Sequence, residues 1–491
     1  MRQLLWILAL VFGCTACGRS ERSVADETIV GKAAPGDDSL PSVWTRARGT
    51  DWPAFLGPTG DSKSSETGLI VPWPNEGPRI VWQQELGTGY GIGSVAAGRY
   101  FHFDRHDRRP GSPSGSARLT CHNAETGQEM WRFEYASIYN DMLGYNNGPR
   151  ASPVVDGNRV YIFGVEGMLH CLRATDGGLV WKVNTTEKFG VVQNFFGAGS
   201  TPAIFGDRLI CMVGGSPPGS RTLYDSNGAV DGNGSGIVAF NKITGAVEYA
   251  ATNELAGYSS PRLATIAGRP WCFMFCRGGL VGLDPRNGKI DFEYPWRAET
   301  LESVNASTPV VAGNEVFISE TYQIGSSLLA VKPGGYDVVW HDERRSRDKS
   351  FRAHWNTPIY VDGHLYGCTG RNPPDAELRC IEWKTGKVKW TIETGIRSSL
   401  LYVDGHFICL GEFGVLELLK VNPERCEIVS KLTLRRDEPG NDPYDNGSPR
   451  LLKYPCWAAP ILSHGLLYVR GDDRLVCLEV IPDKAGTNAK D

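Results

Sequence analysis

Residues with the potential for chemistry lie in eight short segments spread along the chain. The segments read GYGIGS, NNGPRAS, FGAGST, GYSSP, SVNAST, AHWNT, GIRSS and YPCWAA. Arginine binds carboxylates through two parallel hydrogen bonds, and pocket aromatics receive planar or apolar groups, so this set could hold a carboxylated or planar ligand, or a peptide. The same side chains could instead only satisfy backbone groups and plug a channel. The candidate binding residues are Tyr90, Asn147, Arg150, Tyr258, Asn305, His354, Trp355, Asn356, Arg397 and Trp457.

Most of the thirteen cysteines indicate packing rather than catalysis or metal binding. Four of them share one position of a repeated strand, where other copies have Ala, Gly or Leu, so we expect small buried side chains there. No spacing predicts a disulfide, although some remain possible. Cys272 and Cys276 flank Phe-Met-Phe without a second Cys or His pair, so no zinc site is predicted. The shared position holds Cys121, Cys171, Cys380 and Cys477, and elsewhere Ala239, Gly282, Ala330 and Leu418.

Two segments rich in Asp, Asn and Gly resemble calcium-binding loops only superficially. They are Asp225–Gly236 and Asp437–Gly447. Calcium loops place oxygen ligands at alternating positions and end on a bidentate Glu, which both segments lack. We therefore predict flexible polar loops, no metal site and no catalytic residue.

The N-terminus has the pattern of a secretion signal. A positive start and a short apolar stretch, Leu4–Phe12, precede Cys14 and Cys17, and this stretch is too short to span a bilayer. Gly13-Cys14 and Ala16-Cys17 both look like lipoprotein processing sites, with Cys14 slightly favoured. An ordinary cleaved signal that removes both cysteines is the alternative. We predict a signal over residues 1–17 and a flexible tether over residues 18–50.

The elements that must position the candidate residues are eight copies of one repeat. A short apolar strand, a Gly-containing turn, two more strands and a fourth strand with an aromatic residue make up each copy. Four-stranded units with periodic aromatics are typical of propeller blades. The fourth-strand aromatics are Trp82, Trp131, Trp181, Tyr249, Phe292, Trp340 and Trp390, and the seventh copy has Val429 instead.

The two ends of the repeat region predict a closed ring. The last copy, Trp457–Val480, has only three strands, whereas Arg79–Leu86 supplies a fourth strand before the first copy. Pairing the two would remove exposed sheet edges. We predict an all-β fold, an eight-bladed β-propeller over residues 79–482, with a leader segment over residues 51–78 and a polar tail over residues 483–491.

The loop lengths predict one plain and one elaborated face. With the strands of a blade lettered A to D outward, the A-to-B and C-to-D turns are short. The predicted insertions, 103–117, 213–236, 341–355 and 431–456, are B-to-C or D-to-A connections, which share the other face. The candidate binding residues lie in D-to-A connections, which should reach furthest toward the channel. The net charge of −4 gives no general reason to expect nucleic acid, and we expect a monomer.

The repeats resemble the pyrroloquinoline-quinone (PQQ) repeats of bacterial propeller proteins, over residues 79–480. The clearest copy is Ala151–Trp181, ASPVVDGNRVYIFGVEGMLHCLRATDGGLVW, and the leader Asp51–Gly57 (DWPAFLG) extends the resemblance. The superfamily contains quinoprotein alcohol and glucose dehydrogenases, which hold PQQ and calcium. It also contains BamB-type outer-membrane assembly lipoproteins, which are not enzymes. The repeat encodes blade packing and does not itself distinguish these branches.

The resemblance leaves three functions open. The sequence lacks the adjacent cysteine pair of the alcohol dehydrogenases and a matching calcium-binding set, which favours a non-catalytic envelope lipoprotein that binds proteins or extended peptides, with no cofactor. We expect it in the periplasm, anchored to the outer membrane. As a quinoprotein, it would use Arg150, Asn305, His354 and Arg397 to hold the carboxylates of PQQ. A carbohydrate-related accessory protein would use Trp355 and Trp457.

Overall fold

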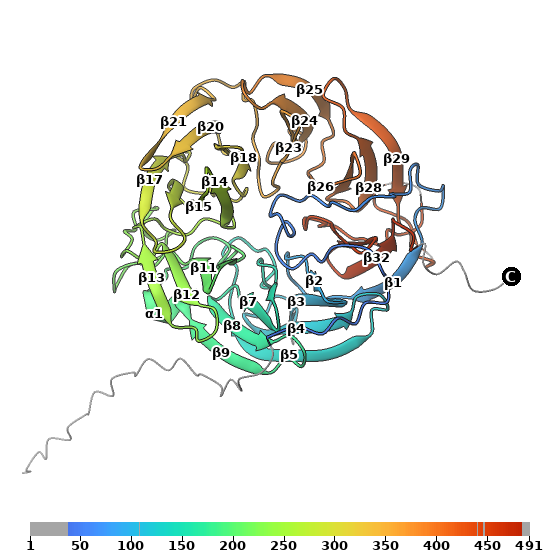
Figure 1. The fold of residues 1–491 in the computed structure, drawn as a ribbon, viewed down its shortest axis with the longest axis horizontal. Helices are drawn as coiled ribbons and strands as arrows, with labels where there is room; N and C mark the ends of the chain where they lie inside the picture. Colours follow the sequence, from blue (N-terminus) through green and yellow to red (C-terminus); the bar gives the residue numbers. More distant parts are fainter. Residues whose placement is uncertain (1–37, 108, 439, 445–446, 484–491) are drawn as a thin grey trace, which may run out of the picture.

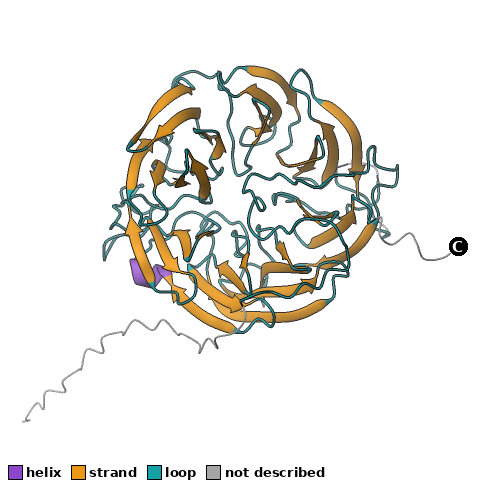
Figure 2. Cartoon of the chain, viewed as in Figure 1, coloured by secondary structure: helices purple, strands orange, loops and turns teal. Residues whose placement is uncertain are grey.

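Eight four-stranded antiparallel sheets surround a central axis in the computed structural model (Figure 1). The structure describes residues 38–107, 109–438, 440–444 and 447–483. Within these ranges the elements are strands apart from one short helix, α1 (Thr185–Phe189), at the rim (Figure 2). The predicted all-β, eight-bladed propeller is therefore confirmed.

The first four blades follow one another along the sequence. Blade 1 contains β2 (Ser94–Ala96), β3 (Arg99–Asp107), β4 (Ser114–Asn123) and β5 (Glu129–Ile138). Blade 2 contains β6 (Val154–Asp156), β7 (Arg159–Phe163), β8 (Met168–Arg173) and β9 (Leu179–Asn184). Blade 3 contains β10 (Ala203–Phe205), β11 (Arg208–Met212), β12 (Ile237–Asn241) and β13 (Val247–Ala251). Blade 4 contains β14 (Arg262–Ile266), β15 (Arg269–Phe275), β16 (Gly279–Leu283) and β17 (Ile290–Pro295).

The last four blades complete the ring. Blade 5 contains β18 (Val310–Ala312), β19 (Glu315–Glu320), β20 (Gly325–Lys332) and β21 (Gly335–His341). Blade 6 contains β22 (Ile359–Val361), β23 (His364–Thr369), β24 (Glu377–Glu382) and β25 (Val388–Glu393). Blade 7 contains β26 (Ser398–Val403), β27 (His406–Gly411), β28 (Val415–Lys420) and β29 (Glu427–Thr433). Blade 8 contains β30 (Ile461–Ser463), β31 (Leu466–Arg470), β32 (Arg474–Glu479) and β1 (Ile80–Glu85).

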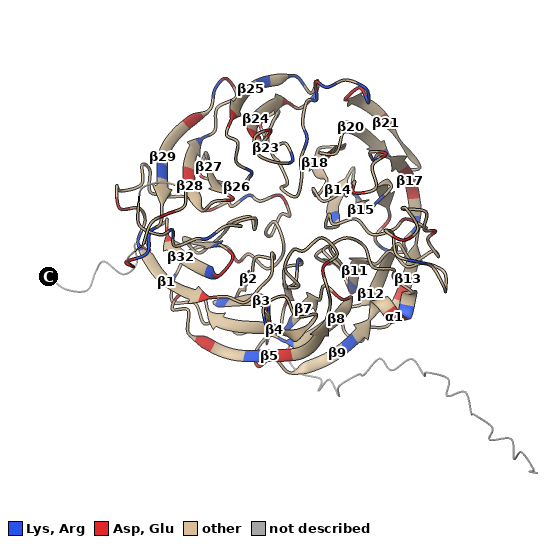
Figure 3. Cartoon of the chain, turned by 180° about the vertical axis from the view of Figure 1, so that it is seen from behind, with Lys and Arg blue, Asp and Glu red and all other residues tan. Residues whose placement is uncertain are grey.

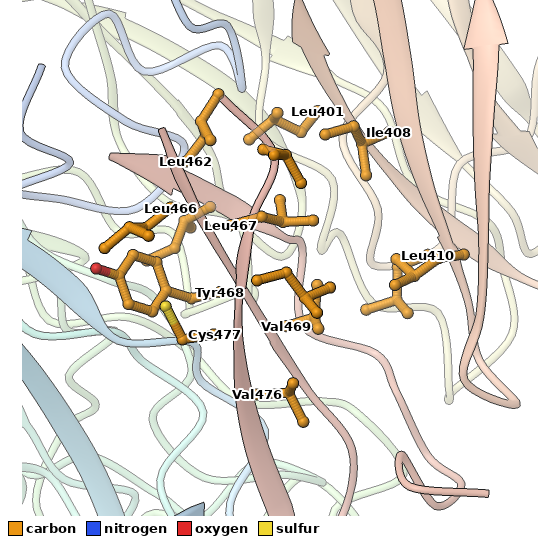
Figure 4. Close-up of a cluster of buried hydrophobic side chains, with 14 of the residues drawn as sticks. Leu401, Ile408, Leu410, Leu462, Leu466, Leu467, Tyr468, Val469, Val476 and Cys477 are labelled. Atoms are coloured by element: carbon orange, nitrogen blue, oxygen red, sulfur yellow. The ribbon is translucent and has the colours of Figure 1, made fainter. Parts of the chain in front are cut away.

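Ring closure occurs in blade 8, where β1 pairs antiparallel with β32 as predicted. Gln83 lies opposite Val476, and Trp82 lies opposite Cys477. The core at this junction is a cluster of Leu, Val and Tyr side chains from blades 7 and 8, including Leu410, Leu467 and Tyr468 (Figure 4). Burial of this apolar surface holds the two ends of the propeller together.

The fourth-strand aromatics connect each blade to the next one. The indole of Trp131 donates a 3.1 Å hydrogen bond to the carbonyl oxygen of Ala174, and Trp181 donates one of 3.0 Å to Lys242. The Gly of the next C-to-D turn lies against the same ring: a Cβ on Gly177 would come within 2.6 Å of Trp131. This contact explains why the repeat carries both an aromatic strand and a Gly turn.

The cysteines are packing residues in the structure. The eleven cysteines that the structure describes are all free, and ten of them are buried. Cys171 lies opposite Trp181, and Cys380 lies opposite Trp390. Burial raises the pKa of the Cys171 and Cys380 thiols to about 12, so both thiols are un-ionised near neutral pH.

The register of blade 5 differs from the prediction. Leu328, rather than Ala330, lies opposite Trp340. The cause is the C-to-D turn, which is shortened to Pro333-Gly334 between Lys332 and Gly335. The spacing from Ala330 to Trp340 is the same as in the other copies. The shorter turn moves the pairing by two positions, so the side chain opposite Trp340 still lies on the same face of the sheet.

One predicted insertion is largely strand. Residues 103–107 and 114–117 extend β3 and β4, so the connection itself is short. Arg105 is buried and paired with Asp107 at 2.6 Å. The other three insertions, 213–236, 341–355 and 431–456, lie mostly between strands, as expected. Charges of both signs are interspersed along the outer strands (Figure 3).

The segment that precedes β1 packs along one face of the ring. Residues 38–50, which the sequence assigns to a tether, already contact the propeller: Asp38 pairs with Arg159, and Trp44 stacks on His464. Trp52 exchanges two backbone hydrogen bonds with Val95. The rest of the predicted tether, the signal, and Cys14 and Cys17 lie outside the described residues.

Candidate functional site

A cavity of about 270 Å³ lies at the centre of the ring. All eight D-to-A connections contribute to its wall, as the loop pattern predicts. The B-to-C connections of blades 5 and 6 add Tyr322 and Arg371. In sequence order, the D-to-A connections contribute Tyr90, Arg150, Phe196, Tyr258, Val304, Trp355, Arg397 and Trp457, among other residues.

Eight of the ten candidate residues lie in the cavity wall, and Asn147 and Asn305 do not. Asn147 is buried, accepts a hydrogen bond from the backbone of Asp141 and donates one to Ser112. The Asn305 amide donates to three carbonyl oxygens, among them that of Cys276 at 2.8 Å. Both amides therefore bond to the backbone of the loops. This is the second of the two roles considered from the sequence, in which the side chains satisfy backbone groups instead of binding a ligand.

Arg397 is held by a buried carboxylate. Its guanidinium makes a bidentate contact with Glu412, with a shortest distance of 2.6 Å from Nη2 to Oε2. Glu412 follows β27, is 1% exposed, and also accepts from Trp457 Nε1 at 3.1 Å. The guanidinium carbon lies 4.4 Å from the ring centroid of Trp355 and 5.2 Å from that of Trp457. The charge of Arg397 is thus neutralised within the protein, and its planar group forms part of an aromatic wall.

Arg150 is held in the same way as Arg397, by a different buried carboxylate and two aromatic rings. It pairs with the buried Asp141, with Nη2 2.8 Å from Oδ2, and lies over the rings of Tyr90 and Tyr139. It also contacts the carbonyl oxygen of Gly148. Burial raises the pKa of Tyr90 to about 12, so this phenol stays neutral. Both candidate arginines are therefore already occupied by an internal carboxylate.

Aromatic rings form a continuous series around the cavity. Trp457 lies 5.0 Å from Tyr90, 5.1 Å from Trp355 and 5.9 Å from Tyr145, measured between ring centroids. From Tyr145 the series continues through Phe196 to Tyr258, at 5.3 Å for each step. Such separations are typical of tilted and edge-to-face packing. The wall is consequently broad, apolar and rigid.

His354 and Tyr322 extend this wall toward blade 5. The His354 ring lies 4.9 Å from Trp355, and its Nε2 is 3.4 Å from the Tyr322 hydroxyl. Burial, and then the charges of Arg397 and Arg371, lower the pKa of His354 to about 3. Its Nδ1 has no hydrogen-bond partner among the residues that the structure describes. His354 is therefore a neutral group with one free hydrogen-bonding nitrogen near the cavity.

Within the described part of the chain, two charged residues at the cavity, Arg371 and Glu302, are not paired with an opposite charge as Arg150 and Arg397 are. Arg371 is exposed, with its guanidinium carbon 4.4 Å from the centroid of Tyr322. Glu302 is also exposed and lines the cavity. Among the described residues, neither has an opposite charge within 4 Å, in contrast to Arg150 and Arg397.

The leader segment forms one end of the cavity. Phe55, Leu56 and Ser62 contribute to the lining. Val155 donates to the carbonyl oxygen of Pro53 at 2.8 Å, and Tyr402 donates to that of Ser62 at 2.9 Å, so the segment is fixed to inner strands of blades 2 and 7. In Figure 1 the blue segment before β1 reaches the centre of the ring.

Several cavity residues escaped prediction. Tyr322 and Arg371 come from B-to-C connections, and Phe55 and Leu56 come from the leader, so the pattern of D-to-A loops could not identify them. Tyr145 and Phe196 lie just before or at the start of the candidate segments, and their aromatic character was the available signal. Nothing in the sequence pointed to Glu412, because its role depends on Arg397, which lies in a different connection between strands.

The described residues contain no group of three or more His, Cys, Asp and Glu side chains placed to hold a metal ion. In the same part of the protein, no helix has the length and apolar character needed to cross a membrane.

Comparisons with known proteins agree with the propeller. A family model described as outer membrane protein assembly factor BamB matches residues 115–392. The solved structure of BamB from Moraxella catarrhalis is similar, with 14% identity, a TM-score of 0.51, and coverage of 82% of this chain and 97% of that one.

The solved structures of two dehydrogenases are also similar. Quinohemoprotein alcohol dehydrogenase from Comamonas testosteroni has 13% identity and a TM-score of 0.46, covering 90% of this chain and 81% of that one. A europium-containing methanol dehydrogenase has 12% identity and a TM-score of 0.45, with coverage of 87% and 89%. Among curated protein sequences, none matches this chain.

Proposed function

This chain belongs to the family described as outer membrane protein assembly factor BamB, and from that premise we propose that it is a non-catalytic binding protein of the bacterial cell envelope. It acts in the periplasm or at the outer membrane through contacts with other proteins. The finer part of the proposal is that the elaborated face binds extended peptide segments of envelope proteins. An N-terminal lipid on Cys14 or Cys17 would keep it at the membrane.

The observation that carries this proposal is the aromatic cavity on the elaborated face. Tyr145 is 44% exposed and Tyr454 is 41% exposed, and both rings pack against Trp457. Rigid aromatic side chains that remain partly exposed are typical of protein-binding surfaces, because they bury much area at little entropic cost. All eight D-to-A connections converge there, so the propeller supports the surface rigidly.

The cavity residues do not fit PQQ with calcium. A ligand carboxylate at Arg150 or Arg397 would have to displace Asp141 or Glu412, which are buried and bonded to those arginines. Asn305, the third proposed contact, has its amide nitrogen engaged by three backbone carbonyls. The donor set around the cavity is aromatic rather than carboxylate-rich, whereas calcium requires six to eight oxygen ligands.

Site-specific photo-crosslinking tests the proposed binding face. A photoreactive residue at Tyr145 should crosslink to envelope proteins in intact cells. The matched control is Lys289, which is exposed in the C-to-D turn of blade 4, on the plain face. Equal crosslinking at both positions, or none at Tyr145, would contradict a binding role for the elaborated face.

Titration of the purified protein with PQQ and calcium tests the alternative function, a quinone-dependent oxidoreductase. We expect neither a fluorescence change nor dye-linked oxidation of alcohols and sugars. Stoichiometric binding that disappears in Arg397→Ala would overturn the proposal.

A further inference from the structure

We propose that the cavity receives an aromatic side chain of a partner polypeptide whose carboxylate, beside that ring, is bound by Arg371. This inference rests on the proposed function, because it names the peptide chemistry that the same face selects. The shared chemistry is an aromatic ring next to a carboxylate. The carboxylate can come from the C-terminus of the partner or from an internal Asp or Glu.

The shape of the cavity argues for a single inserted side chain. Phe55 and Leu56 of the leader line the cavity, and Leu56 is 5% exposed. Backbone hydrogen bonds from Val155 and Tyr402 fix this segment across the inner strands. A polypeptide therefore cannot thread through the ring and must enter from the elaborated face. A volume of about 270 Å³ has room for a large side chain.

The composition of the wall argues that this side chain is aromatic. The face of the cavity is formed by rings at tilted and edge-to-face angles, such as Tyr145 against Phe196 at 81° and Trp355 against Trp457 at 47°. A further ring can join such an array by the same contacts, and aromatic pairs gain more than their buried area alone provides. An aliphatic side chain would fill the space but would lose this additional attraction.

The charges argue that an anion accompanies the ring. Arg150 and Arg397 are neutralised by Asp141 and Glu412, whereas Arg371 has no carboxylate within 4 Å among the described residues. The Arg371 guanidinium lies against Tyr322, so its aromatic contact leaves its edge free to bind a carboxylate. The loop is also held in place, because the Arg371 carbonyl oxygen accepts from Arg397 Nη1 at 3.1 Å.

The same charges disfavour a cationic ligand, which an aromatic pocket would otherwise attract. The guanidinium groups of Arg397 and Arg150 already cover aromatic faces. Burial is the main cause of the lowered pKa of His354, and the positive charges of Arg397 and Arg371 lower it further. A lysine or arginine side chain would therefore be repelled, and a carboxylate would be attracted. Glu302 is the opposing charge, and its removal should tighten binding of an anion.

Calorimetric titration with short acetylated peptides tests the inference on the full-length protein. The probes are Gly-Gly-Phe as the free acid, the same peptide as its amide, Gly-Gly-Leu as the free acid, and Gly-Phe-Asp-Gly as its amide. We expect the Phe free acid to bind and its amide to bind roughly tenfold more weakly, the size expected for one charge-assisted hydrogen bond. Binding of the Phe-Asp amide would assign the carboxylate to an internal acid, and its failure to bind would assign it to a C-terminus.

Variants of the protein test where the carboxylate and the aromatic ring of the peptide bind. Arg371→Ala should weaken the Phe free acid roughly tenfold and leave the amide unchanged, while Glu302→Gln should strengthen the free acid. Arg347→Ala is the matched control, because Arg347 is an exposed arginine of a D-to-A connection outside the cavity wall. Tyr145→Ala should weaken both Phe peptides. Because Tyr145 is partly exposed, we expect the variant to fold, which circular dichroism would check.

The inference is overturned if the amide binds as well as the acid, if Leu matches Phe, or if Arg371→Ala changes nothing. Failure of the proposed function has a different signature. If Tyr145 crosslinks to an envelope protein while no peptide binds, the binding face stands and the aromatic-carboxylate specificity is wrong. If neither occurs, both are wrong.

Discussion

At the scale of single residues, the pair of Arg397 and Glu412 shows how the cavity wall is held. Glu412→Ala would leave Arg397, whose side chain is 10% exposed, without its carboxylate and Trp457 without its acceptor. Breaking a buried pair from one side costs about 3–5 kcal/mol, so we expect urea denaturation to show a loss of this size.

The double variant Arg397→Met, Glu412→Leu is the control for this prediction. Removing both charges leaves no uncompensated ion, so most of the stability should return. If the double variant is as unstable as Glu412→Ala, then packing rather than charge dominates at this site.

A second prediction at this scale concerns pH. Burial lowers the pKa of His102, His170 and His354 to about 3 in each case. An unfolded histidine binds a proton below about pH 6.5, whereas these folded ones do so only near pH 3. The unfolded state therefore binds more protons between these values, and the free energy of unfolding should fall as the pH is lowered from 6.5 toward 3.

His170→Asn isolates the contribution of one histidine to this dependence of the free energy of unfolding on pH. His170 is 2% exposed and packs against Tyr135 with ring centroids 4.3 Å apart. Urea denaturation at several pH values should give a shallower dependence for this variant than for the natural protein. His341→Asn, at an exposed position, controls for the loss of a surface histidine. An unchanged slope in His170→Asn would contradict the assignment.

At the scale of elements, the C-to-D turns and the fourth-strand aromatics act together. Gly177 has φ +74°, and a Cβ there would lie 2.6 Å from Trp131. Gly313 has a similar φ of +61° but open space around it. Gly313→Ala should cost only the strain of a left-handed residue, about 1–2 kcal/mol. Gly177→Ala should cost about 1–3 kcal/mol more, because the ring must move. Thermal and urea denaturation of the two variants would measure the difference, and equal losses would show that the blade contact tolerates a methyl group.

The same elements show what could be predicted from sequence. The aromatic strand and the Gly turn recur with a fixed offset, so the blades and the closure by Arg79–Leu86 were predictable. Blade 5 departs from that offset because Pro333-Gly334 shortens the turn. The spacing from Ala330 to Trp340 still matches the other copies, so only backbone geometry reveals the changed pairing. The prediction that D-to-A connections carry the binding residues identified eight residues of the cavity wall. It missed Arg371, which reaches the cavity from a B-to-C connection, and Glu412, which acts through Arg397. Contacts between blades depend on how the ring closes, and a repeat pattern does not encode them.

At the scale of the whole molecule, stability depends on one junction between distant parts of the sequence. Glu85 and Arg474, which pair there, are 389 positions apart. Trp82 supports this junction: its indole donates to the carbonyl oxygen of Ala124 at 2.9 Å, and its ring lies 5.8 Å from Tyr468. Trp82→Ala should cost about 3–5 kcal/mol, as other buried Trp-to-Ala changes do.

The comparison with Trp131→Ala separates local packing from ring closure. Trp131 makes the equivalent contact with Ala174, but its strand β5 is joined to its partner β4 by a short turn. Strand β1 has no such connection to β32, and re-forming the pair requires closing almost the entire propeller. Trp82→Ala should therefore release β1, speed hydrogen exchange in β32 and expose an edge that promotes concentration-dependent association. Light scattering and hydrogen exchange should show these effects in Trp82→Ala alone. If Trp131→Ala associates equally, the loss of any blade contact opens the ring, and the junction has no special role.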